Sequence, residues 1–326
     1  MSDIEGAGTT TTQARTELNL LQGNHECEVS FNGEAGLHLY RNRCTKNPNH
    51  SKFIPLPSFT ASYLPLQYGD EDIVQTIKLN ASLTVRICCT QTSLDRPQFF
   101  ADDLQPFPFY NYQGRPLTRT GTGRAWSTRV FKHSDNTPCP CSKCVGVGNK
   151  TWGRVSVYTA RHVVFDKHEA RNTSCRFGYD SEEHLRDGLT VDLEGVDIGV
   201  ADHHGDVCEI ICVTHDLGLV EKITQARISL MKLNAKIYNK YRMAGDEHRL
   251  VIIVSHPHGC SKQVTVGEWT AKNSAREAET AYTYTTDTCP GSSGAAVYIL
   301  GRLGVGFCHL HSGSTNQGNV SGYWMN

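Results

Sequence analysis

The sequence predicts an all-β protein of antiparallel strands, arranged as a sandwich or as barrels, with one long inserted helix. From Thr118 onward, short apolar segments of strand length alternate with turns, a spacing typical of antiparallel sandwiches and barrels. One segment differs, because apolar residues recur every three or four positions over about 218–242. That period predicts an amphipathic helix. We expect this helix to pack on the strands by its apolar face.

The elements are expected in the following order. Residues 1–20, with four consecutive threonines and few large apolar residues, predict a disordered tail. Residues 21–80 form an N-terminal extension of unknown fold, apart from a short polar helix at 71–78. A strand at 82–88 and an ordered surface loop at 95–118 follow. Further strands are expected at 121–131, 152–160, 196–201, 207–214, 250–255, 261–269, 294–300 and 303–311.

Composition excludes several classes of function. The 326 residues carry 32 Lys and Arg against 33 Asp and Glu, a net charge of −1 that argues against binding nucleic acid or an anionic membrane. No apolar run approaches the ~18 residues of a membrane span. The first residues lack the basic and apolar regions of a signal peptide. We therefore expect an intracellular protein. The 13 cysteines, an odd number, favour free thiols or metal ligands over a disulfide framework.

A candidate nucleophile lies in the segment TCPGSSGAAV at 288–297. A nucleophilic serine needs a turn that exposes its hydroxyl and directs backbone N–H groups at one point, where an oxyanion develops. Gly291 permits the unusual dihedral angles of such a turn, and Gly294 lets the chain pass close behind Ser293. The same composition is also common in ordinary loops.

Two further residues could complete a catalytic set. His162 follows the strand that ends at Ala160, a rigid position for a general base, although one histidine among 15 is weak support. Asp197 is embedded in the apolar sequence GVDIGV at 195–200. A carboxylate buried there needs a partner. Orienting an imidazole is one role for it, and a structural turn is the alternative.

Taken together, these motifs resemble the catalytic signatures of chymotrypsin-like serine proteases. His162, Asp197 and Ser293 occur in that order, in the contexts TARH, VDIGV and PGSSGAAV. Residues 282–294, YTYTTDTCPGSSG, resemble the divergent trypsin-like branch that includes glutamyl endopeptidases and bacterial members. GTG at 121–123 and HPHG at 256–259 are similar to accessory motifs of the family. The resemblance covers about 81–326.

This resemblance implies two six-stranded antiparallel barrels with the active site between them. His162 would take the proton of Ser293, Asp197 would fix the imidazole, and the N–H groups of Gly291 and Ser293 would hold the oxyanion. The substrate would be a protein or peptide, and no cofactor would be required for catalysis. Ser292 stands where animal trypsins have the aspartate that pairs with a newly cut N-terminus, so no zymogen switch of that type is expected.

The same resemblance implies two opposed specificities. Asp287 lies six residues before Ser293, where trypsins hold an acid that binds Arg or Lys. Thr288 and His311 occupy the places where glutamyl endopeptidases bind an acidic side chain. A neutral histidine donates a hydrogen bond to a carboxylate, and a protonated one adds charge. We expect cleavage after glutamate, with Arg or Lys as the alternative.

A cysteine-rich insert at 133–144 carries Cys139, Cys141 and Cys144. Three thiols within six residues suit a structural zinc ion, with His133, Cys175 or a distant cysteine as fourth ligand. Free or disulfide-bonded cysteines are the alternative. Cys208 and Cys212, four residues apart on a strand, share one face and are expected to be buried apolar residues.

The leading hypothesis is therefore an active serine endopeptidase. One alternative is a catalytically silent trypsin-like fold that acts as a binding or recruitment module. Another is that the cysteine insert and the N-terminal region form a recruitment module, with proteolysis secondary.

Overall fold

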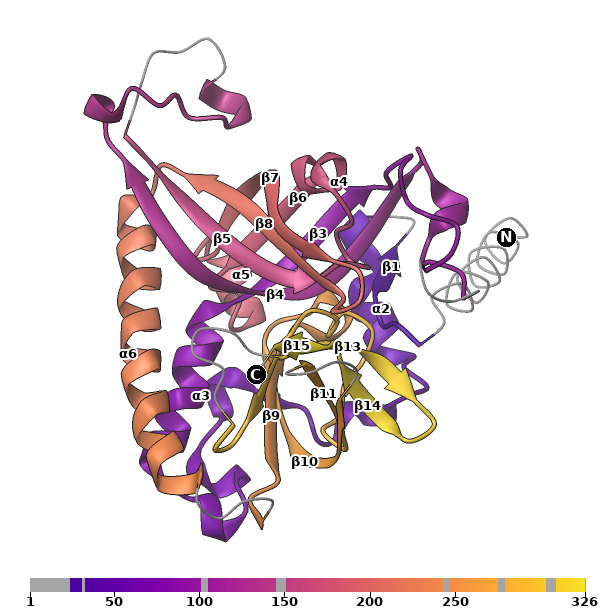
Figure 1. Cartoon of the computed structure of the whole chain (residues 1–326), viewed down its shortest axis with the longest axis vertical. Helices are drawn as coiled ribbons and strands as arrows, with labels where there is room; N and C mark the ends of the chain where they lie inside the picture. The colour runs from indigo at the N-terminus through magenta and orange to yellow at the C-terminus, as the bar shows by residue number, and fades with distance from the viewer. Residues whose placement is uncertain are drawn as a thin grey trace.

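The computed structural model describes residues 24–30, 33–100, 105–144, 151–242, 247–274, 279–302 and 309–325. These residues form two antiparallel sheets, one above the other in Figure 1, with a long helix beside both. The predicted tail at 1–20 and most of the strand predicted at 303–311 lie outside the described residues. Within the described residues, no helix is long and apolar enough to cross a membrane.

The first sheet closes into a barrel. Six strands pair in the order β4-β3-β6-β7-β8-β5, and β5 pairs back with β4 to close the ring. The short strand β1 is added to the outer side of β4. The strands of this sheet are β1 (Glu28–Ser30), β3 (Thr84–Gln91), β4 (Pro116–Phe131), β5 (Trp152–Ala160), β6 (Thr173–Phe177), β7 (Val191–Asp202) and β8 (Val207–Thr214).

The second sheet closes in the same way. Its ring runs β11-β14-β13-β12-β9-β10, and β10 pairs back with β11. The strands are β2 (Ile54–Pro55), β9 (Leu250–Ser255), β10 (Gln263–Ser274), β11 (Glu279–Tyr284), β12 (Ala296–Ile299), β13 (His309–Thr315), β14 (Gly318–Ser321) and β15 (Trp324–Met325). Two six-stranded antiparallel barrels are the chymotrypsin-like architecture, so the predicted fold class is confirmed.

The predicted helix at about 218–242 is present as α6 (Leu217–Tyr241). Asp216 caps it by accepting a hydrogen bond from the backbone N–H of Leu219 at 2.9 Å. Its apolar stripe packs on the core of the first barrel through Val220. Further along the helix, Ile237 belongs to a second apolar cluster, with Ile73 of the N-terminal extension and Leu250 of β9. The shorter helices are α2 (Leu37–Asn42), α3 (Glu71–Leu83), α4 (Lys167–Arg171) and α5 (Glu182–Arg186). The helix predicted at 71–78 therefore extends five residues further.

The extension at 21–80 contributes to both sheets where it is described. β1 pairs with β4 of the first barrel, and β2 pairs with β10 of the second. Helix α3 packs against α6. Ion pairs join Asp70 to Lys240 and Asp72 to Lys236, each at 2.5 Å, across that helix contact.

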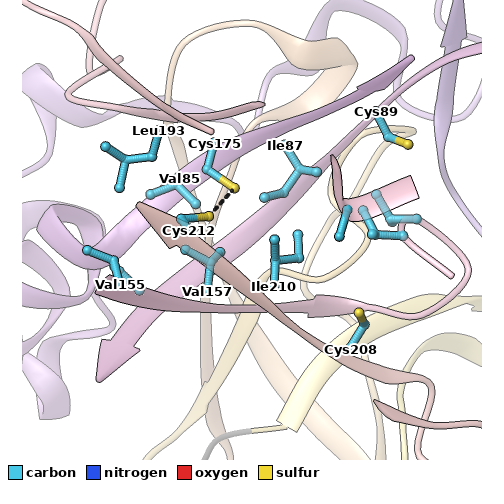
Figure 2. Packing of buried hydrophobic residues seen from close by; sticks show 14 of the residues in the cluster. Val85, Ile87, Cys89, Val155, Val157, Cys175, Leu193, Cys208, Ile210 and Cys212 are labelled. Atoms are coloured by element: carbon cyan, nitrogen blue, oxygen red, sulfur yellow. Dashed lines mark hydrogen bonds between the residues drawn. The ribbon is translucent and has the colours of Figure 1, made fainter. Parts of the chain in front are cut away.

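The core of the first barrel is apolar and includes several thiols (Figure 2). Cys208 and Cys212 are fully buried there, as their shared strand face predicts. Cys175 lies in the same core, with its Sγ 3.5 Å from that of Cys212. Close packing around these side chains gives the rigid frame from which His162 projects.

Candidate active site

His162 lies two residues after the end of β5 and is fully buried. It donates a hydrogen bond from Nδ1 to Oδ2 of Asp206 at 2.7 Å, and its backbone N–H donates to Oδ1 of the same carboxylate at 3.0 Å. The hydroxyl of Ser312 also donates to Oδ2 of Asp206, at 2.6 Å. Burial by itself would lower the pKa of His162, but the charge of Asp206 raises it. This pairing fixes the imidazole with Nε2 directed away from Asp206.

The prediction that Asp197 orients His162 is wrong. Asp197 lies within β7, where its half-exposed carboxylate pairs with Lys167 Nζ at 2.5 Å. In the sheet it is opposite Ile211, four residues along β8 from Val207, or about 13 Å along the strand. The sequence VDIGV matched the family motif, but the acid that contacts His162 is Asp206.

Strand register explains why Asp206 has this position. β5 and β8 are antiparallel neighbours, and Ala160 is opposite Val207. The residues just after Ala160 therefore meet those just before Val207, which brings His162 to Asp206. Asp206 has a φ of 51° in the tight turn between β7 and β8, a conformation that Asp tolerates better than most residues. The sequence does show an acid in a turn before a buried strand. That pattern identifies Asp206 as the partner of His162 only when the pairing of β5 with β8 is known.

Ser293 lies in the loop between β11 and β12 and is fully buried. The two predicted glycine roles are met, since Gly291 and Gly294 have φ values of 96° and 85°. A Cβ on Gly294 would lie 2.3 Å from the carbonyl oxygen of Thr122, and one on Gly291 would lie 2.6 Å from that of His256. Each glycine is therefore required by a positive φ and by a close backbone approach.

Both accessory motifs support this loop. Thr122, the centre of GTG, donates from its backbone N–H to the carbonyl of Ser293 and from its hydroxyl to that of Gly291, both at 2.8 Å. The HPHG turn donates from the N–H of His258 to the carbonyl of Pro290 at 2.6 Å. Contacts from both barrels therefore hold the Ser293 loop in place.

Two polar atoms of this site have no hydrogen-bond partner among the described residues. They are Nε2 of His162 and Oγ of Ser293, and both are buried. Unpaired buried polar atoms cost free energy and are rare in native structures. In a serine protease the serine hydroxyl donates a hydrogen bond to the base nitrogen, and Ser293 and His162 do not make that hydrogen bond in this structure.

Residues 24–30 of the same chain, here called the docked segment, run through this site. The backbone N–H of Gly291 donates to the carbonyl oxygen of Glu26 at 2.8 Å, and that of Ser314 donates to the carbonyl of Asn24 at 2.7 Å. His25 pairs with Gly313 in an antiparallel bridge. The ring of His25 lies over that of His162, with centroids 4.3 Å apart.

The side chain of Glu26 is held by four groups, here called the carboxylate site: Lys46, Thr288, His311 and Ser314. Oε2 accepts hydrogen bonds from the Thr288 hydroxyl and from His311 Nε2, each at 2.9 Å. Oε1 accepts from the Ser314 hydroxyl at 2.9 Å and from Lys46 Nζ. The predicted determinants Thr288 and His311 therefore meet on one carboxylate.

Electrostatics keep this carboxylate charged. Burial would raise the pKa of Glu26, but the hydrogen bond from His311, followed by the charge of Lys46, holds it well below its usual range. Burial lowers the pKa of His311 despite Glu26. A neutral His311 with its proton on Nε2 donates to Glu26, and its Nδ1 accepts from the Tyr284 hydroxyl at 2.7 Å.

Asp287, the candidate acid for binding Arg or Lys, has a different partner. Its Oδ2 pairs with Lys52 Nζ at 3.2 Å. The carboxylate site contains no acid among the described residues apart from the bound Glu26 itself.

The cysteine insert has a fourth group nearby. Ligand atoms of Cys139, Cys141, Cys144 and His215 all lie within 4.8 Å of one another. The fourth member is His215, directly after β8, rather than any of the expected candidates. Cys175 instead lies in the first-barrel core against Cys212.

Comparison with known proteins gives structural neighbours only. No protein-family model and no curated protein matches the chain. Among solved structures, the chain is similar to the HtrA-type protease AlgW with a decapeptide, at 13% identity and a TM-score of 0.39, over 77% of this chain and 63% of that one. A protease of M. tuberculosis in its active form matches at 14% and 0.39, over 79% and 82%. Deg5 matches at 11% and 0.39, over 79% and 90%.

Proposed function

We propose that this protein is a serine endopeptidase in which Ser293, His162 and Asp206 act together. The observation that carries the proposal is the hydrogen bond from the N–H of Gly291, two residues before Ser293, to the carbonyl oxygen of Glu26. A backbone N–H that binds a peptide carbonyl in the loop of the candidate nucleophile is the arrangement of an oxyanion hole.

Each of these groups has a defined role in the mechanism. Ser293 Oγ attacks the substrate carbonyl carbon and passes its proton to Nε2 of His162, while Asp206 stabilises the resulting imidazolium. Backbone N–H groups of Gly291 and Ser293 hold the oxyanion. His162 returns the proton to the leaving amine, and water then hydrolyses the acyl-enzyme. No cofactor takes part in these steps.

We also propose that the enzyme cleaves after glutamate. The carboxylate site supplies one positive charge and three neutral donors to a glutamate side chain that is nearly buried. Lys46 would repel an Arg or Lys side chain in this place, and Asp287 is already paired with Lys52. Charge and donor geometry therefore favour an acidic side chain before the cleaved bond.

A peptide-library profile tests this specificity, and the Thr288→Val variant tests the contribution of one hydrogen bond to it. The variant removes one hydrogen bond to a charged group, typically about 1.5–3 kcal/mol. We expect kcat/KM for a glutamate peptide to fall about 10–100-fold, with little change for the glutamine analogue. Asp287→Asn is the control and should leave the preference unchanged. Preferred cleavage after Arg or Lys, lost in Asp287→Asn, would contradict the proposal.

A further inference from the structure

We propose that the chain cuts itself between Glu26 and Cys27, and that the cut is intramolecular. This inference rests on the proposed endopeptidase function and identifies one substrate of it. The docked segment is part of the same chain, so no second molecule is needed to bring it to the site.

The position of the cut follows from which carbonyl is held by the oxyanion donor. Gly291 N–H binds the carbonyl of Glu26 at 2.8 Å, and the bond that follows this carbonyl joins Glu26 to Cys27. Glu26, the residue before the cut, binds in the carboxylate site by its side chain, which matches the proposed preference for glutamate. Cys27, on the other side, is buried beside His162 and raises its pKa, in addition to Asp206.

The segment is held on both sides of this bond. Before it, Asn24 and His25 form strand contacts with Gly313 and Ser314 of β13. A Cβ on Gly313 would lie 1.9 Å from the carbonyl oxygen of Asn24, so only glycine allows this approach. After it, β1 pairs with β4 from Glu28 onward. Fixing both flanks gives the alignment that makes an intramolecular reaction fast.

The reaction balances with water as the one co-reactant. Ser293 Oγ forms an ester with the carbonyl carbon of Glu26, and the C–N bond to Cys27 breaks. The proton of Ser293 passes through His162 to the new amine of Cys27. Water hydrolyses the ester, which restores Ser293 and leaves a free carboxylate on Glu26. The products are residues 1–26 and 27–326.

Cutting also has a consequence for the site. Until residues 24–26 leave, they cover His162 and fill the carboxylate site, so other substrates are excluded. Self-cleavage converts this tether into a separate peptide that can dissociate. The uncut chain is therefore self-inhibited, and cleavage opens the site.

The test is translation of the full chain in vitro, followed by intact mass and N-terminal sequencing. We expect a product beginning Cys27-Glu28-Val29, formed at a rate constant that stays unchanged over a 100-fold dilution. Ser293→Ala and Glu26→Gln should remain uncut, and Glu26→Gln should turn over an external glutamate peptide at least 10-fold more slowly than wild type. Glu17→Gln, the matched control, should be cut like wild type.

Three outcomes would overturn the proposal. A wild-type chain that cleaves the external peptide but stays intact at Glu26 would refute self-cleavage and leave the endopeptidase function standing. A rate proportional to chain concentration would refute the intramolecular route. A chain that neither cuts itself nor cleaves the peptide would refute both functions together.

A different observation carries a second inference: we infer that the chain binds two zinc ions, one in each of two cysteine–histidine clusters. The insert cluster is Cys139, Cys141, Cys144 and His215; the loop cluster is Cys44, His50, His258 and Cys289. In each, the four ligand atoms lie within 4.8 Å of one another. Tetrahedral zinc with sulfur and nitrogen ligands needs such atoms about 3.3–3.8 Å apart.

The loop cluster has the detailed geometry of a metal site. The sulfurs of Cys44 and Cys289 are 3.6 Å apart, too far for a disulfide. His50 Nε2 lies 3.5 Å from the sulfur of Cys289 and 3.1 Å from Nε2 of His258. Nδ1 of His258 is bound by the Glu28 carboxylate at 2.6 Å, the partner that metal-binding histidines commonly have.

The insert cluster is similar. His215 Nε2 lies 3.2 Å from the sulfur of Cys144 and 3.7 Å from that of Cys141. Its Nδ1 contacts the carbonyl of Thr151 at 3.2 Å, which directs Nε2 toward the thiols. The cysteines of both clusters are free thiols. The loop cluster is also close in sequence to the proposed active site. Cys289 is two residues from Gly291, the proposed oxyanion donor, and Cys44 is two residues from Lys46 of the carboxylate site.

Metal analysis of the purified full chain tests this inference. We expect about two zinc ions per wild-type chain, and about one in each of Cys44→Ser and Cys141→Ser. Cys208→Ser, which changes a buried thiol outside both clusters, should keep two. Cobalt-substituted wild type should show thiolate-to-cobalt absorption, a readout that does not depend on variants folding. A metal-free chain, a Cys44→Ser variant that keeps two ions, or a mass that reveals a Cys44–Cys289 disulfide would overturn it.

Discussion

Replacing Ser293 or His162 by alanine should abolish peptide turnover to about the same extent, on the order of 10⁶-fold. The reason is that the serine is a weak nucleophile without its base, and the base has no role without the serine. The double variant should therefore be no worse than either single variant. Turnover of a glutamate peptide, measured for all three, checks this non-additivity.

Additive losses in the double variant would show that the two residues do not share a mechanism. Retention of turnover in Ser293→Ala would place the nucleophile elsewhere. Either result would favour a trypsin-like fold used for binding, the alternative that the sequence left open.

Asp206→Asn should lower the turnover rate about 10⁴-fold, whereas Asp197→Asn should change it little. Asparagine keeps the shape of Asp206 but can favour the wrong imidazole tautomer and no longer stabilises the imidazolium. The half-exposed carboxylate of Asp197 pairs with Lys167, whereas His162 pairs with Asp206. The two variants make the same chemical change at the two acids, so each is the control of the other.

The pH profile gives these variants a second readout. His162 must be neutral to accept a proton, so activity rises as pH passes upward through its pKa. The charge of Asp206 raises that pKa, and its removal should move the rise to lower pH. Asp197→Asn should leave the midpoint in place. A profile shifted by Asp197→Asn and not by Asp206→Asn would reverse the assignment.

Local patterns predicted those parts of the molecule that depend on nearby residues. The period of α6, the glycines around Ser293 and the histidine after β5 can all be read from short segments. A family resemblance predicted Thr288 and His311 as specificity determinants, and both contact the carboxylate of Glu26 in the structure.

The remaining parts depend on contacts between distant segments. Asp206 meets His162 because β5 and β8 are neighbours in one register. The sequence alone favoured Asp197, nine residues earlier, because its surroundings match the family motif. The docked segment reaches the site from the N-terminal extension, where no local signal marks Glu26 as a ligand. His215 completes the insert cluster from 71 residues beyond Cys144.

The most direct test of the serine endopeptidase assignment is the reaction of the full chain with a fluorophosphonate probe, read by mass spectrometry of its peptides. We expect one adduct, on Ser293, that is lost in Ser293→Ala and His162→Ala but retained in Ser292→Ala, which changes the neighbouring hydroxyl. Labelling should be weaker in Glu26→Gln, whose docked segment stays in place. An unlabelled wild-type chain that has already been cut after Glu26, or an adduct that survives Ser293→Ala, would contradict the assignment.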